Sequence, residues 1–204
     1  MQRREFIGMA AGLAFSPTSA NAIGERMLVP SQVSPPDTVS ILHGYELQGG
    51  ICLLDVGDAT TEASAYRSGA CMARVRFAFG ENTLIDAIRR RLDVDFQEAQ
   101  EIIARDGHAF ACLVEGLEPL CRQGVLLTRV VDGLPLRREL TAIIQAEIEG
   151  MFAEVREFLG NNRYDLAYGV VVHGRVAAIP GIVELGEEVF HSLVRTVPTH
   201  ETVG

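Results

Sequence analysis

The change of hydrophobic period at Gly80 constrains the fold of this chain more than any other feature. Before Gly80, residues 51–56 form a nearly continuous apolar run and residues 71–79 alternate from one side chain to the next, which is the two-residue period of β-strands. After Gly80, apolar side chains recur on one helical face, at Leu84, Ile85, Ile88 and Leu92. A sheet that passes directly into helices predicts an α/β arrangement.

The segments before Gly80 predict a meander of antiparallel strands. We expect strands at residues 39–42, 51–56, 62–66 and 71–79, with Ser68-Gly69 as the hairpin turn before the last strand. Because these strands are consecutive and joined by short turns, each is expected to pair with its neighbour in the chain.

Helical periodicity predicts three elements after the meander. The first helix carries Asn82 or Thr83 as its N-cap, and the second begins at Asp95 and ends at Gly107. The third spans residues 137–159 and stops at residues 160–162. Its continuous apolar stripe consists of Leu140, Ile143, Ile144, Ile148, Met151, Phe152, Val155, Phe158 and Leu159.

Strands and a helix alternate in the last part of the chain. Residues 168–172 predict a buried strand, residues 182–190 a helix and residues 193–197 a final strand. Residues 108–134 are the least regular stretch; within them we expect a strand at 125–131 and a turn at Asp132-Gly133. The order of elements predicts an α/β domain with an inserted section.

Composition excludes two classes of partner. The chain has 204 residues, 48% of them apolar and 22% charged, with a formal net charge of −9, so it is a folded protein that nucleic acid and anionic lipid would repel. Its four cysteines have no metal-site spacing, and we expect no metal. Cys52, Cys71 and Cys112 have mostly apolar neighbours, which predicts buried thiols, while Cys121 stays unassigned.

The N-terminal 38 residues are expected to lie outside the compact domain. Arg3-Arg4, the apolar residues 9–15 and Ala20-Asn21-Ala22 have the three parts of a twin-arginine-like export signal. The equal alternative is the ragged start of a truncated domain. Residues 28–40 are rich in proline and serine, which indicates a linker or exposed loop.

The turn after the first buried strand has the chemistry of a phosphate loop. Such a loop needs small residues for close backbone approach, and hydroxyls with a carboxylate to hold a hydrated metal. Asp55, Gly57, Thr60 and Thr61 suit that task, whereas Asp58 and Ala59 in the bend do not. The alternative is that Asp55 and the threonines only cap a β-turn.

The collinear order of these segments resembles the C-terminal half of FtsA, the family of bacterial actin-like cell-division proteins. The family motif D-x-G-G-G-T-T-D is similar to residues 55–62, and the helix L-x-E-L-A-E-E-V-F is similar to residues 182–190. The resemblance extends over residues 48–198. Its other matches are Gly80 with Asp86, residues 95–100, residues 137–152 and residues 193–195.

This resemblance implies the second lobe of an actin-like ATPase (ribonuclease H-like) fold, with a mixed sheet, a β-meander and a small α/β insertion. The lobe would cover residues 39–198, with the insertion at about 93–135 and a tail at 199–204. The matching positions imply a relic nucleotide or phosphate site. Its residues would be Asp55, Gly57, Thr60, Thr61, Glu149 and Gly174.

Departures from the family pattern imply that this site has lost function. The family has three glycines where this chain has Gly174, Arg175 and Val176, so two side chains enter space that the family leaves for adenosine. The first actin lobe, the partner-binding extra subdomain and the membrane-binding helix of the family have no counterpart in the sequence. We expect no catalytic residue and no cofactor, with ATP and Mg²⁺ only if the family site is still used.

The resemblance implies a cytoplasmic cell-division protein that acts by protein contact. Its partners would be an FtsZ-like ring protein, another FtsA-like chain or a second copy of itself, without direct insertion into the membrane. Two alternatives remain: an ATP-binding protein whose first lobe is supplied separately, and an exported protein that reuses the fold. The arginines of residues 89–91 could contact an acidic peptide or form a solvated helix end. We expect His173 to be a loop residue without a catalytic partner.

Overall fold

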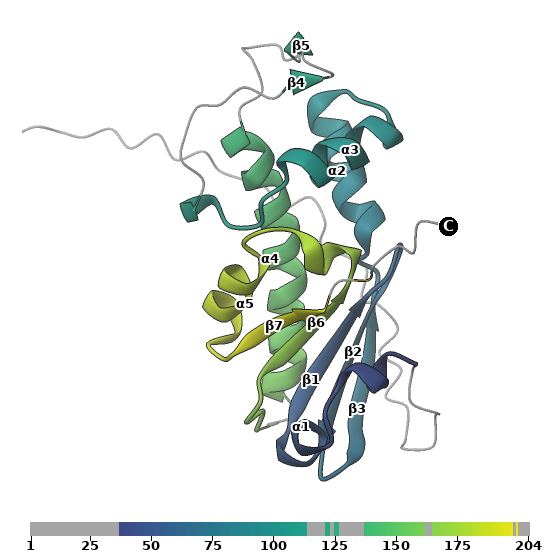
Figure 1. Ribbon diagram of the computed structural model, residues 1–204, viewed down its shortest axis with the longest axis vertical. Helices are drawn as coiled ribbons and strands as arrows, with labels where there is room; N and C mark the ends of the chain where they lie inside the picture. The colour runs from purple at the N-terminus through teal and green to yellow at the C-terminus, as the bar shows by residue number, and fades with distance from the viewer. Residues whose placement is uncertain are drawn as a thin grey trace, which may run out of the picture.

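A five-stranded mixed sheet forms the centre of the molecule (Figure 1). The computed structural model describes residues 37–113, 121–122, 125–126, 137–161, 165–197 and 199. Its helical elements are η1 (Asp37–Ile41), α1 (Gly44–Gly49), α2 (Glu81–Leu92), α3 (Phe96–Asp106), η2 (Ala111–Leu113), α4 (Arg137–Asn161), η3 (Arg175–Ala178) and α5 (Ile182–Phe190). Its strands are β1 (Ile51–Val56), β2 (Thr61–Arg67), β3 (Ala70–Phe77), β4 (Cys121–Arg122), β5 (Val125–Leu126), β6 (Val170–Gly174) and β7 (Val194–Val197).

The strand order β3-β2-β1-β6-β7 combines the predicted meander with a parallel half. β1, β2 and β3 are antiparallel neighbours, and Ser68 and Gly69 form the tight turn between β2 and β3 with positive φ angles of 53° and 77°. β6 and β7 run parallel to β1, so each needs a crossover connection. The helices α4 and α5 lie within these connections, as the sequence predicts.

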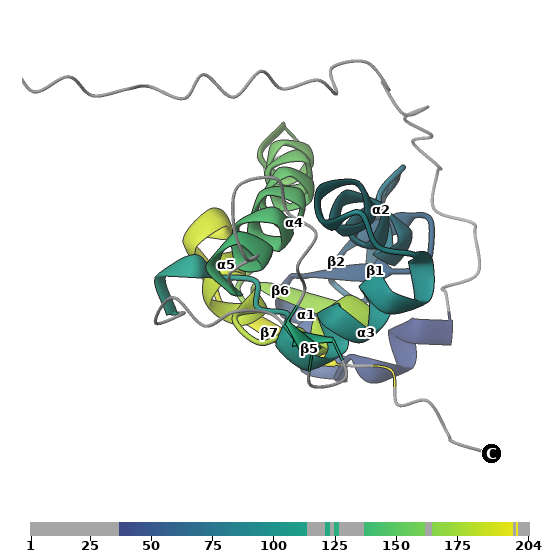
Figure 2. The same ribbon diagram turned by 90° about the horizontal axis from the view of Figure 1, so that it is seen from above.

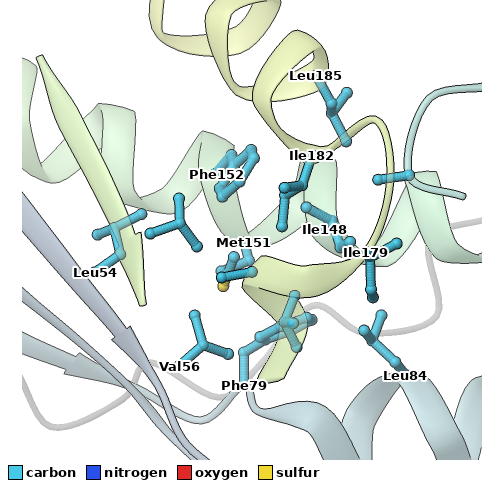
Figure 3. Packing of buried hydrophobic residues seen from close by; sticks show 14 of the residues in the cluster. Leu54, Val56, Phe79, Leu84, Ile148, Met151, Phe152, Ile179, Ile182 and Leu185 are labelled. Carbon is cyan, nitrogen blue, oxygen red and sulfur yellow. The ribbon is translucent and has the colours of Figure 1, made fainter. Parts of the chain in front are cut away.

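The main hydrophobic core lies between the sheet and its helices. Viewed from above, α2 and α4 lie on one side of the sheet, while η1 and α1 lie on the other (Figure 2). On the first side, side chains of β1, α2, α4 and α5 converge (Figure 3). Fully buried residues here include Leu54, Leu84, Ile148, Phe152 and Ile182. The apolar stripe predicted for residues 137–159 packs on this helix-covered face of the sheet.

A smaller apolar cluster lies on the opposite face of the sheet. Ile51, Leu53, Tyr66 and Val171 are buried there beneath η1 and α1, with Leu42 closing the cluster. Glu46 of α1 is also buried, and its carboxylate accepts hydrogen bonds from Arg195 of β7 at 2.9–3.2 Å. This ion pair joins the helix before the sheet to its last strand.

The structure corrects several details of the prediction. Residues 39–42 belong to a 3-10 helix and the segment after it, not to a strand, and α1 was not predicted. The N-cap of α2 is Gly80 rather than Asn82 or Thr83, because the Thr83 hydroxyl instead accepts a hydrogen bond from the Gly80 amide. Of the strand predicted at 125–131, the structure describes only β5; the turn at 132–133 lies outside the described residues.

Among the described helices, none is both long enough and apolar enough to cross a membrane. The predicted export signal lies outside the described residues.

Candidate functional site

The predicted site residues gather where the parallel strands β1 and β6 end. Val56 and Gly174 are register partners there, and the turn of residues 57–60 and η3 follow directly. We call this region the carboxyl edge of the sheet. Ligands of open α/β sheets bind at this kind of position, outside the carboxyl ends of the strands.

The turn of residues 57–60 is fastened to the start of α2. The amides of Glu81 and Asn82 donate to the carbonyls of Gly57 and Asp58 at 3.0 and 2.8 Å. The contact requires glycine at position 80, since an added Cβ would lie 2.4 Å from the Asp58 carbonyl oxygen. Two amides at the N-terminus of α2, a usual place for an anion, therefore already have protein acceptors.

The two threonines of the turn have different environments. Thr61 is fully buried, and its hydroxyl donates to the Phe79 carbonyl at 2.9 Å and lies 3.4 Å from the Met151 sulfur. Thr60 is exposed, and its carbonyl accepts from the Gly57 amide at 2.9 Å. Thr61 thus ties the meander to α4, and only Thr60 presents its side chain to solvent.

Asp55 is paired with a histidine that the sequence placed in a loop. His173 belongs to β6, directly opposite Asp55 in the register, and its Nδ1 lies 2.9 Å from an Asp55 carboxylate oxygen. Both side chains are partly buried. On the other side, Asp55 is the register partner of Glu62, whose carboxylate is bound by Arg74 and Arg76 at 3.1 and 3.2 Å. Each acid of this adjacent pair therefore has a basic neighbour.

Gly174 has the backbone conformation that only glycine adopts readily. Its φ is 109°, and an added Cβ would lie 2.2 Å from the Val56 carbonyl oxygen. The next two residues diverge. Val176 is buried in the main core, because the 3-10 turn η3 directs it inward.

Arg175 instead extends across the carboxyl edge. Its guanidinium lies 3.3 Å from the Glu81 carboxylate at the start of α2. When the side-chain amide of Gln100 is turned so that its oxygen faces Arg175, this oxygen also accepts from the two terminal guanidinium nitrogens at 2.5 and 3.2 Å. One side chain from η3 therefore connects α2 and α3, and it belongs to one of the two residues that replace glycines of the family pattern.

The predicted site residue Glu149 contacts another residue of its own helix, Gln145. It lies on an exposed part of α4, where Gln145 donates to its carboxylate at 3.4 Å. The Gln145 oxygen in turn accepts from the amide of Ala111 at 2.8 Å, which holds η2 against α4.

A groove of about 550 Å³ lies beside α2, next to the turn of residues 57–60. Its polar walls include Arg89 and Arg90, which both contact Asp86: Arg89 by an ion pair at 2.9 Å and Arg90 by a hydrogen bond to the carbonyl at 3.1 Å. The other lining residues are Ala59, Asn82, Thr83, Asp93 and Val94. Two of the three predicted arginines thus line a concave surface.

The cysteines occupy three different environments. Cys52 is buried in the main core, and Cys71 is half-buried on the opposite face of the sheet. Burial raises the pKa of both thiols. Cys112 is exposed, contrary to the prediction, because η2 lies at the surface. The side chain of Cys121 lies outside the described residues.

Sequence reasoning missed the two pairs that characterise the carboxyl edge, Asp55–His173 and Arg175–Glu81. The first could have been found from the order of the sheet, because pairing β1 with β6 in parallel brings their polar residues side by side. For the pair Arg175–Glu81, the sequence contains no comparable pattern. Its partners are 94 positions apart, 175 minus 81, in elements of different kind.

Comparison with curated proteins finds distant relatives of one kind. The chain is 30% identical over 171 residues to the cell division protein FtsA of Neisseria meningitidis, covering 81% of this chain and 40% of that protein. It is 28% identical over 161 residues to FtsA of Pseudomonas aeruginosa, covering 76% and 37%. The chain thus spans about two fifths of the curated relatives it matches. No protein-family model matches it.

Solved structures with the same fold are actin-like. MreB5 of Spiroplasma citri bound to ADP superposes with a TM-score of 0.60 at 19% identity, covering 76% of this chain and 50% of that one. The ethanolamine utilization protein EutJ of Carboxydothermus hydrogenoformans gives 0.54 at 20% identity, covering 74% and 45%. The predicted fold class is therefore confirmed: the chain is an actin-like lobe with distant sequence similarity to FtsA.

Proposed function

We propose that this chain is an FtsA-like cell-division module that acts by protein contact and has lost most of its capacity to bind nucleotide. The observation that carries this proposal is the pairing of side chains at the carboxyl edge, where His173 engages Asp55 and Arg175 engages Glu81. These contacts satisfy the charges that a metal–nucleotide complex would otherwise meet.

Asp55 is the carboxylate that the chemistry of a phosphate loop would use to hold a hydrated metal. A hydrated Mg²⁺ ion needs carboxylate oxygens and room for its water molecules. His173 lies within hydrogen-bond distance of the Asp55 carboxylate, so a bound ion would have to displace the imidazole or tolerate its positive charge when protonated. Both alternatives weaken metal binding.

Arg175 acts against the nucleotide by volume and by its existing contacts. Nucleotide sites of this kind depend on glycine for close approach of the ligand to the backbone. A ligand would have to separate the Arg175 guanidinium from Glu81 and Gln100 before occupying that space. A bound phosphate would also lack two of the amides at the N-terminus of α2, because these amides already donate to the turn of residues 57–60.

For the partner, we propose the acidic C-terminal tail of an FtsZ-like ring protein at the groove beside α2. Arg89 and Arg90 line this groove together with Asp86 and Asp93, and their guanidinium groups are the cations that an acidic peptide would contact there. Their contacts with Asp86 hold the guanidinium groups in place before any peptide arrives. Such preorganisation lowers the entropic cost of binding. This role implies a cytoplasmic location, which a reporter fused to residues 1–40 would test against export.

Calorimetric titration of the purified chain tests both parts. We expect Mg-ATP to bind more weakly than about 1 mM and an FtsZ tail peptide to bind in the micromolar range. Arg90→Glu should weaken the peptide about tenfold, whereas Arg138→Glu, an exposed reversal on α4, should leave it unchanged. Tight Mg-ATP binding would favour the alternative, an ATP-binding protein with its first lobe supplied separately, and equal peptide binding by both variants would remove the groove from the proposal.

A further inference from the structure

The guanidinium of Arg175 binds two acceptors that come from different helices. One terminal nitrogen lies 3.3 Å from the Glu81 carboxylate at the start of α2, and the turned Gln100 amide of α3 accepts from both terminal nitrogens. The side chain of Glu81 is only 12% exposed, whereas that of Arg175 is 41% exposed. We call Glu81 and Gln100 the acceptor pair. Its carboxylate is mostly shielded from water, and a cation from η3 lies against it.

The acceptor pair fits a guanidinium group better than an ammonium group. A guanidinium presents five N–H donors in one plane at fixed angles, whereas the lysine ammonium is a compact point charge. Arg175 can therefore donate to a carboxylate and to an amide oxygen at once, without reorienting between them. Hydrogen bonds between charged groups are also stronger than those between neutral ones.

Arg175 connects two parts of the molecule that are attached to the rest at other points. α2 and α3 lie together beyond one end of the sheet (Figure 1). Two backbone amides hold the start of α2 on the turn of residues 57–60. At the other end of this unit, Asp106 of α3 pairs with Arg137 of α4 at 3.0 Å. Between these attachments, Arg175 fixes the middle of α3 to the first turn of α2.

The groove beside α2 depends on the same two helices. Ala59 of the turn, Asn82 and Thr83 of the first turn of α2, and Val94 between α2 and α3 all line it. The width of the groove therefore depends on where α2 begins relative to the turn, and its far end depends on where α3 begins relative to α2. Arg175 does not line the groove, but it holds both helices that shape it.

We propose that Arg175 is a positioning residue whose guanidinium serves as a built-in ligand of the acceptor pair, so that its contact with Glu81 and Gln100 sets the shape of the groove. The part that concerns the groove rests on the proposed function, whereas the part that concerns the acceptor pair does not. The acceptor pair is thus a binding site for the guanidinium class of cation, occupied from within the same chain. Removal of the Arg175 side chain should leave it open to a free guanidinium compound.

Hydrogen exchange of the full chain tests the acceptor pair, read at the amides of residues 100–104 in α3. Arg175→Ala should accelerate their exchange about threefold, because a partly exposed contact is lost. Methylguanidinium at about 10 mM should restore the wild-type rate by binding the open acceptor pair. Tetramethylammonium, which has the same charge but no N–H donor, should not restore it.

Matched variants separate the role of the guanidinium from charge and from general stability. Arg175→Lys should restore only part of the wild-type rate, since an ammonium lacks the planar fork. Adding Glu81→Gln to Arg175→Ala should abolish the rescue by methylguanidinium. Arg67→Ala removes an exposed guanidinium from the end of β2 and should change nothing. The amides of residues 151–158 in α4 are the internal standard and should exchange at one rate in all variants.

Three exchange results would overturn the acceptor pair as a guanidinium site. Equal exchange of residues 100–104 in wild type and Arg175→Ala would show that the contact holds nothing. Equal acceleration in α4 would mean that Arg175 only supports overall stability. Rescue by tetramethylammonium as complete as that by methylguanidinium would reduce the contact to its charge.

Titration with the acidic tail peptide tests the groove. Arg175→Ala should weaken peptide binding about threefold, with recovery in methylguanidinium, although Arg175 does not line the groove. Unchanged affinity in a variant whose α3 exchanges faster would overturn the positioning of the groove. If the wild-type chain binds no peptide, the proposed partner fails, and the exchange experiment still decides on the acceptor pair.

Discussion

The helix-covered face of the sheet and its carboxyl edge are stabilised in different ways. The first is filled by apolar side chains such as Phe152 and Ile148, both with no exposed surface. The second is occupied by charged side chains that pair with one another, Asp55 with His173 and Arg175 with Glu81. Apolar burial contributes roughly 25 cal/mol per Å², whereas partly exposed ion pairs contribute about 0–1 kcal/mol. The fold should therefore tolerate side-chain substitutions at the carboxyl edge far better than substitutions on the helix-covered face.

The largest expected effect comes from the helix-covered face. Phe152→Ala removes a ring that is fully buried and contacts Phe190 at 5.0 Å between centroids. We expect the free energy of unfolding to fall by about 3–5 kcal/mol, measured by urea denaturation. Glu154→Ala on the exposed side of α4 is the control, with an expected change within about 0.5 kcal/mol. Similar losses in both variants would contradict the contrast between the two regions.

The next effect distinguishes two glycines. Gly174→Ala at the carboxyl edge places a Cβ 2.2 Å from the Val56 carbonyl oxygen at a φ of 109°, and should cost about 1–3 kcal/mol. Gly150→Ala in α4 meets nothing within 4 Å and should stabilise the chain by about 0.5–1 kcal/mol. If backbone geometry is the one strict requirement of the carboxyl edge, thermal melts should show a lower melting temperature for Gly174→Ala and a higher one for Gly150→Ala.

A smaller effect is expected for the pair Asp55 and His173. A double-mutant cycle with Asp55→Asn and His173→Ala should give a coupling energy of about 0.5–1 kcal/mol in unfolding experiments, because both side chains are only partly buried. A coupling energy above about 3 kcal/mol, typical of a fully buried pair, would make the edge part of the framework.

The smallest effect concerns reaction rates and leaves stability unchanged. Among the three cysteines whose side chains the structure describes, an alkylating reagent at pH 8 should label Cys112 first, because it is exposed. Cys71 should react several-fold more slowly, because burial raises its pKa and leaves less thiolate, and its rate should increase more steeply toward pH 10. Cys52 should react only on unfolding. Mass spectrometry of the labelled peptides gives this order, and early labelling of Cys52 would mean that the helix-covered face opens readily.

The fold was largely predictable because its elements have strong periodic patterns. β1 and α5 have the predicted bounds, and the stripe of α4 is the one that packs on the sheet. Prediction failed at residues 37–49, where six-residue and shorter helices have too little periodicity to distinguish them from strands. It also failed for Cys112, whose apolar neighbours lie in a surface turn.

The candidate site was predictable only in the placement of its residues. Asp55, Gly57 and Gly174 meet at one edge because β1 and β6 are parallel neighbours. What these residues contact depends on side-chain partners from distant elements, such as Glu81 for Arg175, and a single sequence has no period that reports such pairs. Their role in ligand binding stays a prediction.

The parallel pairing of β1 with β6 also sets the order in which this chain can fold. The meander of β1, β2 and β3 involves neighbours in sequence, but the Asp55–His173 contact joins residues 118 positions apart, and the Glu46–Arg195 contact joins residues 149 positions apart. Contacts of such long sequence separation form slowly and, on the ribosome, only after most of the chain has emerged. Until then β1 exposes an unpaired edge, so a chaperone that binds extended strands would have its longest opportunity at residues 51–56.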